Sequence, residues 1–327
     1  MKEAEFSIVI CTKNCASTII RVFDSILNQK DYNLVREVLL VFYNTTDETV
    51  KIATEYARKN SFPLKFIECK KPGKTPALML GLNKAVGEFC VIVDDDNFLF
   101  ADYITNAVTL VKDKDFACFG ARGHLDPNLT KPTWFSRYEG HFAIGIPKGD
   151  TDWVWGACAL VNLEAWRSLV DVDYKMWINI ERRNSVAPIL VGGEDTEFSL
   201  AFGLLGYKVK FSEKLNFIHS FDQKRLQKDY FLLNTLGCFR AAAVTEMYRI
   251  VIYDKFFPTP TIRLYYALLR SVLSNSVRSV LAISAGDKFK SEYHRSIVLG
   301  VASGFILFRK DLQKILSNLR QIKESNG

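Results

Sequence analysis

Residues 89–98, F-C-V-I-V-D-D-D-N-F, constrain the fold of this chain more than any other stretch. The first five are apolar without a polar interruption, which fits a strand buried on both faces of a parallel sheet. Three carboxylates and an amide follow directly. Because ligands of open parallel sheets bind outside the carboxyl ends of the strands, these acids are expected to face a ligand.

Asp94 and Asp96 lie two residues apart, so they project to one side if the chain stays extended. Two such carboxylates are oxygen ligands for a hard cation, Mg²⁺ or Mn²⁺, which also takes substrate phosphates as ligands. The competing interpretation is a solvated turn, because Asp and Asn are turn formers.

Strand and helix patterns alternate along the first half of the chain. Strands are expected at residues 5–11, 36–42, 64–68 and 89–93, with helices at 16–28, 50–59 and 76–86 between them. This alternation predicts an α/β domain with a parallel sheet. Further strands are expected at 116–121, 153–161 and 207–211, helices at 102–111 and 163–169, and a helix start within 192–202.

After residue 223 the strand pattern stops, and helices are expected at 224–253, 262–283 and 292–319. Residues 223–327 carry 17 Lys and Arg against 7 Asp and Glu, whereas residues 1–222 carry 26 against 29. A basic helical region predicts an anionic partner, and its aliphatic content suits a membrane surface better than nucleic acid. The alternative is that these helices pack on the preceding domain.

Seven cysteines at scattered positions, an odd number, suggest reduced thiols in a cytosolic setting. The first residues enter a strand without a signal-peptide pattern. The longest late apolar run, residues 296–308, is shorter than the ~20 residues that span a bilayer. We therefore expect no transmembrane helix and a cytoplasmic protein peripheral to the inner face of the cytoplasmic membrane.

Six short motifs occur in an order that resembles the inverting nucleotide-sugar glycosyltransferases of GT-A family 2. They are S-I-V-I-C-T-K-N at 7–14, T-T-D-E-T at 45–49, G-K-T-P-A at 73–77, V-D-D-D-N at 93–97, W-G-A-C at 155–158 and G-G-E-D at 192–195. The resemblance covers residues 5–220. It implies a GT-A fold, Rossmann-like with a mostly parallel sheet, in a catalytic domain of residues 1–222 with a C-terminal helical extension at 223–327.

The resemblance also implies roles for individual residues. Asp195 would be the general base and Glu194 would orient the base or the acceptor; Asp94, Asp96 and His219 would hold Mg²⁺ or Mn²⁺; Cys11, Thr12, Asn14, Tyr43, Lys74, Asp94 and Asp95 would contact the donor; and Trp155, Gly156 and Ala157 would lie on the acceptor side. Structural roles compete with three of these: a helix N-cap for Asp195, a hydrogen-bonded structural histidine for His219 and a solvated lysine for Lys74.

The implied function is metal-dependent, inverting transfer from a nucleotide-diphosphate sugar to a hydroxyl of a glycan or lipid-linked glycan, in surface polysaccharide or glycoconjugate biosynthesis. Phe42 and Tyr43 stand where the family usually has an Asp, and Met79 where a polar residue is common, so the donor nucleotide stays open. Alternatives are a phosphotransferase using Asp94 and Asp96, or a non-catalytic sugar- or nucleotide-binding relative. The sequence identifies neither the sugar, the linkage nor the oligomeric state.

Overall fold

A computed structural model describes residues 4–113, 115–147, 149–178, 190–253 and 259–325. Contacts between residues divide the chain into two compact units. Unit 1 comprises residues 1–171 and 207–222, and unit 2 comprises residues 172–206 and 223–327. Compactness thus groups residues 172–206 with the C-terminal helices, while a functional boundary at residue 222 stays a prediction.

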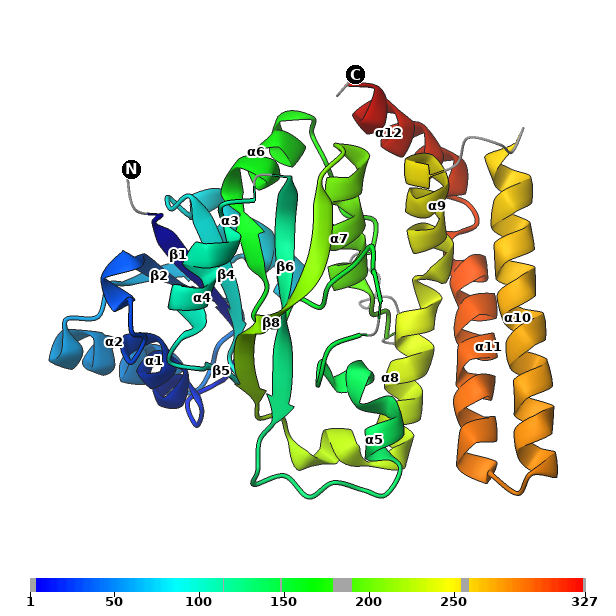
Figure 1. Ribbon diagram of the computed structural model, residues 1–327, viewed down its shortest axis with the longest axis horizontal. Coiled ribbons are helices and arrows are strands. Elements are labelled where there is room, and N and C mark those ends of the chain that lie inside the picture. The colour runs from blue at the N-terminus through cyan, green and yellow to red at the C-terminus, as the bar shows by residue number, and fades with distance from the viewer. Residues whose placement is uncertain (1–3, 114, 148, 179–189, 254–258, 326–327) are drawn as a thin grey trace. The chain divides into compact units, whose positions relative to one another are not determined.

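Within the described residues, unit 1 is built on one eight-stranded sheet (Figure 1). Its strands are β1 (Phe6–Thr12), β2 (Val35–Phe42), β3 (Leu64–Glu68), β4 (Phe89–Asp94), β5 (Asn97–Leu99), β6 (Phe116–Leu125), β7 (Leu160–Asn162) and β8 (Lys208–His219). Their order is β3-β2-β1-β4-β7-β6-β8-β5. Strands β1 to β4 pair in parallel, as does β6 with β8. Strand β7 is antiparallel to both neighbours and β5 to β8, so the sheet is mixed.

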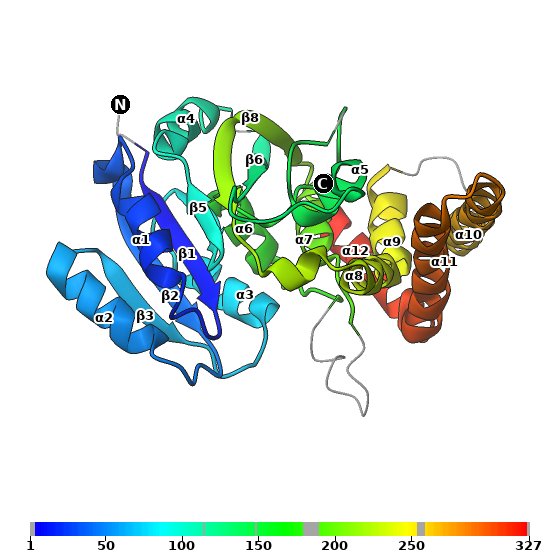
Figure 2. The same cartoon turned by 90° about the horizontal axis from the view of Figure 1, so that it is seen from below.

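Helices cover both faces of the parallel strands. Helices α1 (Ile19–Leu27), α2 (Thr49–Asn60) and α4 (Tyr103–Leu110) share a core with Ile8, Ile10 and Val91, the alternate residues of β1 and β4. Figure 2 shows α1 and α2 side by side against these strands. On the other face, α3 (Lys74–Lys84) approaches β1 so closely that a Cβ on Gly81 would lie 2.5 Å from Val9. Helix α6 (Leu163–Asp171) packs beside α3.

Two sequence expectations fail in the second half of the sheet. A strand was expected over residues 153–161, but only Leu160–Asn162 pairs. The residues before it fold around Trp155, whose Nε1–H donates to the Ala121 carbonyl, and Cys158 has a φ of +50° that no strand allows. Strand β8 in turn continues past the expected end at residue 211 to His219, because it pairs with both β6 and β5.

Unit 2 is helical in its described residues. It contains α7 (Glu194–Leu204), α8 (Lys228–Arg240), α9 (Ala242–Tyr253), α10 (Pro260–Ser284), α11 (Lys288–Phe308) and α12 (Leu312–Glu324). The helices expected at 224–253 and 292–319 are each broken in two, at Ala241 and at residues 309–311. Helices α10 and α11 lie side by side (Figure 1). Among the described helices, none combines the length and the apolar content that a membrane span requires.

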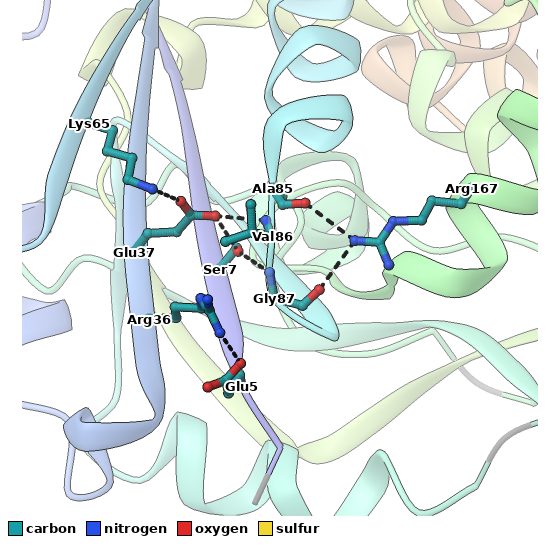
Figure 3. Close-up of polar contacts among 9 residues, drawn as sticks. All are labelled: Glu5, Ser7, Arg36, Glu37, Lys65, Ala85, Val86, Gly87 and Arg167. Carbon is teal, nitrogen blue, oxygen red and sulfur yellow. Dashed lines mark hydrogen bonds and ion pairs between the residues drawn. The ribbon is translucent and has the colours of Figure 1, made fainter.

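A buried polar cluster pins the amino ends of the parallel strands (Figure 3). The Glu37 carboxylate accepts from the Ser7 hydroxyl at 2.8 Å and the Val86 amide at 2.8 Å, and pairs with the Lys65 ammonium at 2.7 Å. Burial alone would raise the pKa of Glu37, but these partners outweigh it and the pKa is lowered. The Glu37 carboxylate finds its partners within the fold, so this cluster is structural. A ligand is expected at the other end of the sheet, beyond the carboxyl ends of the strands.

Candidate functional site

The three consecutive acids form a tight turn at the carboxyl end of β4. Strand β4 ends at Asp94, Asp95 and Asp96 make the turn, and β5 begins at Asn97. The condition of an extended chain, under which Asp94 and Asp96 would project to one side, is therefore not met. The turn follows from pairing, because Asn97 lies opposite His219 in β8 and the Ser220 amide donates to the Asp96 carbonyl at 2.8 Å.

Asp95 turns toward the end of β1. The Thr12 hydroxyl donates to its carboxylate at 2.5 Å. Burial raises the pKa of Asp95 to about 6; the Thr12 bond opposes this, while the like charges of Asp96 and Asp94 add to it. Asp95 thus binds a proton more readily than an ordinary aspartate.

Lys74 lies beside Asp94, with 2.6 Å between Nζ and Oδ1. It is the first residue of α3, directly after Gly73, whose φ of +123° favours glycine. The pair is only partly exposed, 38% for the lysine and 17% for the aspartate side chain. The sequence predicted a phosphate contact for Lys74, and the structure places its ammonium on the acidic turn.

His219 ends β8 instead of lying in a loop, and its ring is buried. Its Nδ1 lies 2.8 Å from the Phe142 carbonyl, which only accepts hydrogen bonds, so Nδ1 carries a proton. Its Nε2 faces the Asp96 carboxylate at 3.5 Å. In the tautomer with the proton on Nδ1, Nε2 and the Asp96 carboxylate oxygen are two acceptors that face each other.

These donors suit a hard cation by their chemistry. Asp94 and Asp96 offer carboxylate oxygens, His219 a ring nitrogen, and the Lys74 ammonium already occupies the position of a counter-cation on Asp94. Within the described residues, no group of three or more His, Cys, Asp or Glu side chains is arranged to hold a metal ion by itself. The protein would therefore supply part of the coordination, with donor phosphates and water completing it.

The loops after β1 and β2 are joined to each other. The Thr46 amide donates to the Asn14 side chain at 2.9 Å, the Ala16 amide to Asp47 at 3.1 Å and the Tyr43 amide to the Thr12 carbonyl at 3.2 Å. Asn14 is exposed and Tyr43 is half-buried, so a sugar nucleotide bound at this edge of the sheet can reach both side chains. Cys11 is buried instead, and burial raises the pKa of its thiol far above the usual range.

The residues predicted for the acceptor side are mostly in the core. Trp155 and Ala157 are buried, and Gly156 is half-buried. The Trp155 ring packs on Phe211 with 4.4 Å between ring centroids. Their acceptor role stays a prediction, and the visible task of Trp155 is packing.

Unit 2 carries the other predicted catalytic residues. Glu194 and Asp195 open α7, directly after Gly193, whose φ is +92°. The Thr196 amide donates to the Asp195 carboxylate at 2.8 Å, so this acid also helps to cap its own helix. Both side chains are half-buried. Unit 1 thus brings together Thr12, Lys74, the acidic turn and His219, while unit 2 brings together Glu194 and Asp195.

Sequence reasoning missed Glu197, one turn into α7. Its carboxylate is fully buried and accepts from the backbone amides of Trp177 and Ile178 at 2.6 Å each and from the Tyr248 hydroxyl at 2.8 Å. Burial raises the pKa of Glu197 to about 7, although these hydrogen bonds oppose the rise. The available signal was weak, because Glu197 follows the polar residues 194–196 and only the residues after it are mostly apolar.

Residues 7–168 match the family described as "Glycosyl transferase family 2". Among curated proteins, poly(ribitol-phosphate) beta-N-acetylglucosaminyltransferase TarS of Staphylococcus aureus is 32% identical over 127 residues, 39% of this chain and 21% of TarS. An uncharacterized glycosyltransferase of Mycoplasma genitalium, MG025, is 29% identical over 30% of this chain and 33% of its own. The matched segments thus span a fifth to a third of these relatives.

Solved structures share the fold. The mannosyltransferase PcManGT of Pyrobaculum calidifontis, in complex with GDP-Man and Mn²⁺, superposes with a TM-score of 0.54 at 19% identity, covering 99% of this chain and 87% of its own. Residues 1–349 of S. aureus TarS superpose with a TM-score of 0.52 at 15% identity, covering 98% of this chain and 90% of that one. The fold class is therefore that of GT-A glycosyltransferases, with a helical C-terminal region.

Proposed function

Because the chain belongs to glycosyltransferase family 2 through residues 7–168, we propose that it moves a sugar from a nucleotide-diphosphate sugar to a hydroxyl of a glycan or lipid-linked glycan, with inversion. The observation that carries this proposal is the cluster of Thr12, Lys74, the acidic turn and His219 at the carboxyl edge of the sheet. Such an edge is where α/β proteins bind nucleotides. The product would enter surface polysaccharide or glycoconjugate biosynthesis.

Asp94, Asp96 and His219 would hold Mg²⁺ or Mn²⁺, which, when bound, neutralises the charge of the leaving diphosphate. The chain's own residues do the rest. The Thr12 hydroxyl holds the Asp95 carboxylate in place within the turn, and Lys74 adds positive charge beside the phosphates of the sugar nucleotide. Asn14 and Tyr43, on loops held together by hydrogen bonds, contact the nucleotide.

Asp195 takes the proton from the acceptor hydroxyl, and Glu194 orients the acceptor or the base. A half-buried carboxylate on the first turn of a helix suits this role, since the helix dipole favours negative charge there. We also propose that the protein works in the cytoplasm, at the inner face of the membrane, with residues 223–327 as its membrane-facing part.

The test is calorimetric titration of the full chain with UDP-GlcNAc and GDP-Man, each with and without Mn²⁺. These two donors are the sugar nucleotides bound by S. aureus TarS and PcManGT in their solved structures. We expect one of them to bind, at least tenfold more tightly with the metal. Asp96→Ala should remove the metal dependence.

Asp195→Asn is the matched control in the same titration. It should bind the donor as the parent does. Its rate of sugar transfer should fall by about three to four orders of magnitude, the upper part of the range that a general base typically contributes. Transfer retained by Asp195→Asn removes Asp195 as the base. Metal-dependent binding retained by Asp96→Ala removes the acidic turn as the metal site.

A further inference from the structure

One face of α10 is apolar and exposed along the whole helix. Six side chains recur at spacings of three and four residues and are each 56–62% exposed: Ile262, Tyr266, Leu269, Leu273, Val277 and Val280. This spacing puts them on one side of the helix, here called the α10 face. A helix of 25 residues is about 37 Å long at 1.5 Å per residue, so the face is a long stripe.

The orientation of α10 within unit 2 is fixed by its opposite side. Leu264 and Leu268 are buried there. The Asn275 amide oxygen meets the His294 ring at 2.8 Å, and the Ser279 and Ser291 hydroxyls lie 2.8 Å apart, both joining α10 to α11. Buried polar pairs of this kind tolerate little rotation of the helix. The α10 face, on the other side of the helix, therefore points away from α11.

Charge is distributed unevenly around the same helix. Arg263 and Arg270 lie on one flank of the α10 face, seven residues apart, and the helix contains no Asp or Glu. Two copies of the chain packed through this face would bring arginines to the contact with no acidic side chain on α10 to pair with them. Single exposed apolar residues are ordinary, but a continuous stripe marks an interaction surface.

We infer that the α10 face lies in the interfacial layer of an anionic lipid bilayer. The apolar side chains would enter the acyl boundary, Tyr266 would sit at headgroup level, and the arginines would meet lipid phosphates. This narrows the proposal that residues 223–327 face the membrane, and rests on that part of the proposed function. It assigns the contact to one helix face.

The test is co-sedimentation of the full chain with vesicles of phosphatidylcholine alone or of equal parts phosphatidylcholine and phosphatidylglycerol. We expect binding to the anionic vesicles and little to the neutral ones. Leu273→Glu/Val280→Glu should weaken binding about tenfold or more, because two apolar side chains no longer enter the acyl region. Arg270→Gln should weaken binding and flatten its salt dependence.

Val170→Glu is the matched control, since Val170 is an exposed apolar residue, 44% accessible, on α6 of unit 1. It should bind vesicles as the parent does. The inference is overturned if Leu273→Glu/Val280→Glu binds the anionic vesicles as strongly as the parent does. It is also overturned if the parent binds neither kind of vesicle. A parent dimer in light scattering that Leu273→Glu/Val280→Glu dissociates would assign the face to a second copy instead. Donor titration, run on the same samples, reports on the sugar-transfer proposal separately.

Discussion

Asp95 and Glu197 show how burial retunes single carboxyl groups in this protein. Their pKa values rise to about 6 and about 7, because loss of solvent outweighs the hydrogen bonds that each accepts. Asp126 is the contrast: burial acts on it too, but bonds from Ser220, the Asn128 amide and Arg21 lower its pKa to about 2. The number and charge of the donors decide the direction of the shift.

Glu197 should make the protein less stable as pH rises through neutrality. Its folded pKa of about 7 lies above the ordinary value of 4.5, so its favourable contribution is complete below 4.5 and lost as pH rises through 7. The full span is roughly 3 kcal/mol at 1.4 kcal/mol per pKa unit. Urea unfolding between pH 5 and pH 8 should show a steeper loss in the parent than in Glu197→Gln.

Glu55→Gln, an exposed change on α2, is the control and should leave the pH dependence unaltered. Asp95 contributes in the same direction in every variant, so the difference between the parent and Glu197→Gln isolates Glu197. Identical slopes for these two would mean that Glu197 keeps an ordinary pKa in the folded protein.

At the level of elements, two glycines set how closely α11 packs on α8. A Cβ on Gly300 would lie 2.6 Å from the Leu236 carbonyl oxygen, and one on Gly304 would lie 2.1 Å from that of Arg240. Both obstacles are backbone atoms, which cannot rotate away. The pair at i and i+4 thus lets the two helix backbones come into direct contact.

Gly304→Ala should therefore destabilise the protein by about 1–3 kcal/mol, the usual cost of overpacking, although alanine favours the helix. The measurement is urea unfolding followed by circular dichroism. Ala302→Leu, at an exposed position on the same helix, should change the free energy of unfolding by less than about 0.5 kcal/mol. An unchanged Gly304→Ala would show that α8 and α11 separate at little cost.

The sequence predicted elements well where local signals and tertiary packing agree. Strands β1 to β4 begin and end within one residue of their expected bounds, and in β1 and β4 the reason is a mostly apolar run that is buried on both sides. The same signal misled over residues 153–161, where apolar residues surround a buried tryptophan instead of pairing. The break at Ala241 was invisible, since alanine is the strongest helix former and packing alone ends α8 there.

The candidate site was predictable as a set of residues and less so as a geometry. Asp94 and Asp96 could be selected because they stand at the end of a strand, and Lys74 because it follows a glycine at the same edge of the sheet. The turn at Asp95, its bond to Thr12 and the end of β8 at His219 depend on pairing between residues 83 and more positions apart, which no local pattern encodes.

At the level of the whole molecule, the chain leaves unit 1 after residue 171, returns for residues 207–222, and then leaves again. Helix α7 belongs to the first excursion, yet it packs on α9 and α12 of the second. Glu197 bonds to Tyr248 of α9, and the Gly192 amide donates to the Gly237 carbonyl of α8 at 3.0 Å. The two excursions form one folding unit.

A fragment of residues 1–222 should therefore keep its sheet but lose order in α7, residues 194–204. Phe198 and Phe202, buried in the whole chain, would become exposed. We expect the fragment to bind the dye ANS and to be cleaved within α7 by a protease that spares this helix in the full chain. A fragment that resists the protease as the full chain does would show that α7 folds without α8 and α9.

Because unit 2 is made of two separate segments of the chain, its parts are also synthesised at different times. During synthesis, α7 leaves the ribosome about 50 residues ahead of the end of α9, and at ~5–20 residues per second the delay is roughly 2–10 s. Over that interval unit 1 can complete its sheet, because β8 ends at His219. The apolar residues of α7, however, remain without their packing partners until α9 has been synthesised. This interval is when the nascent protein would depend most on a chaperone.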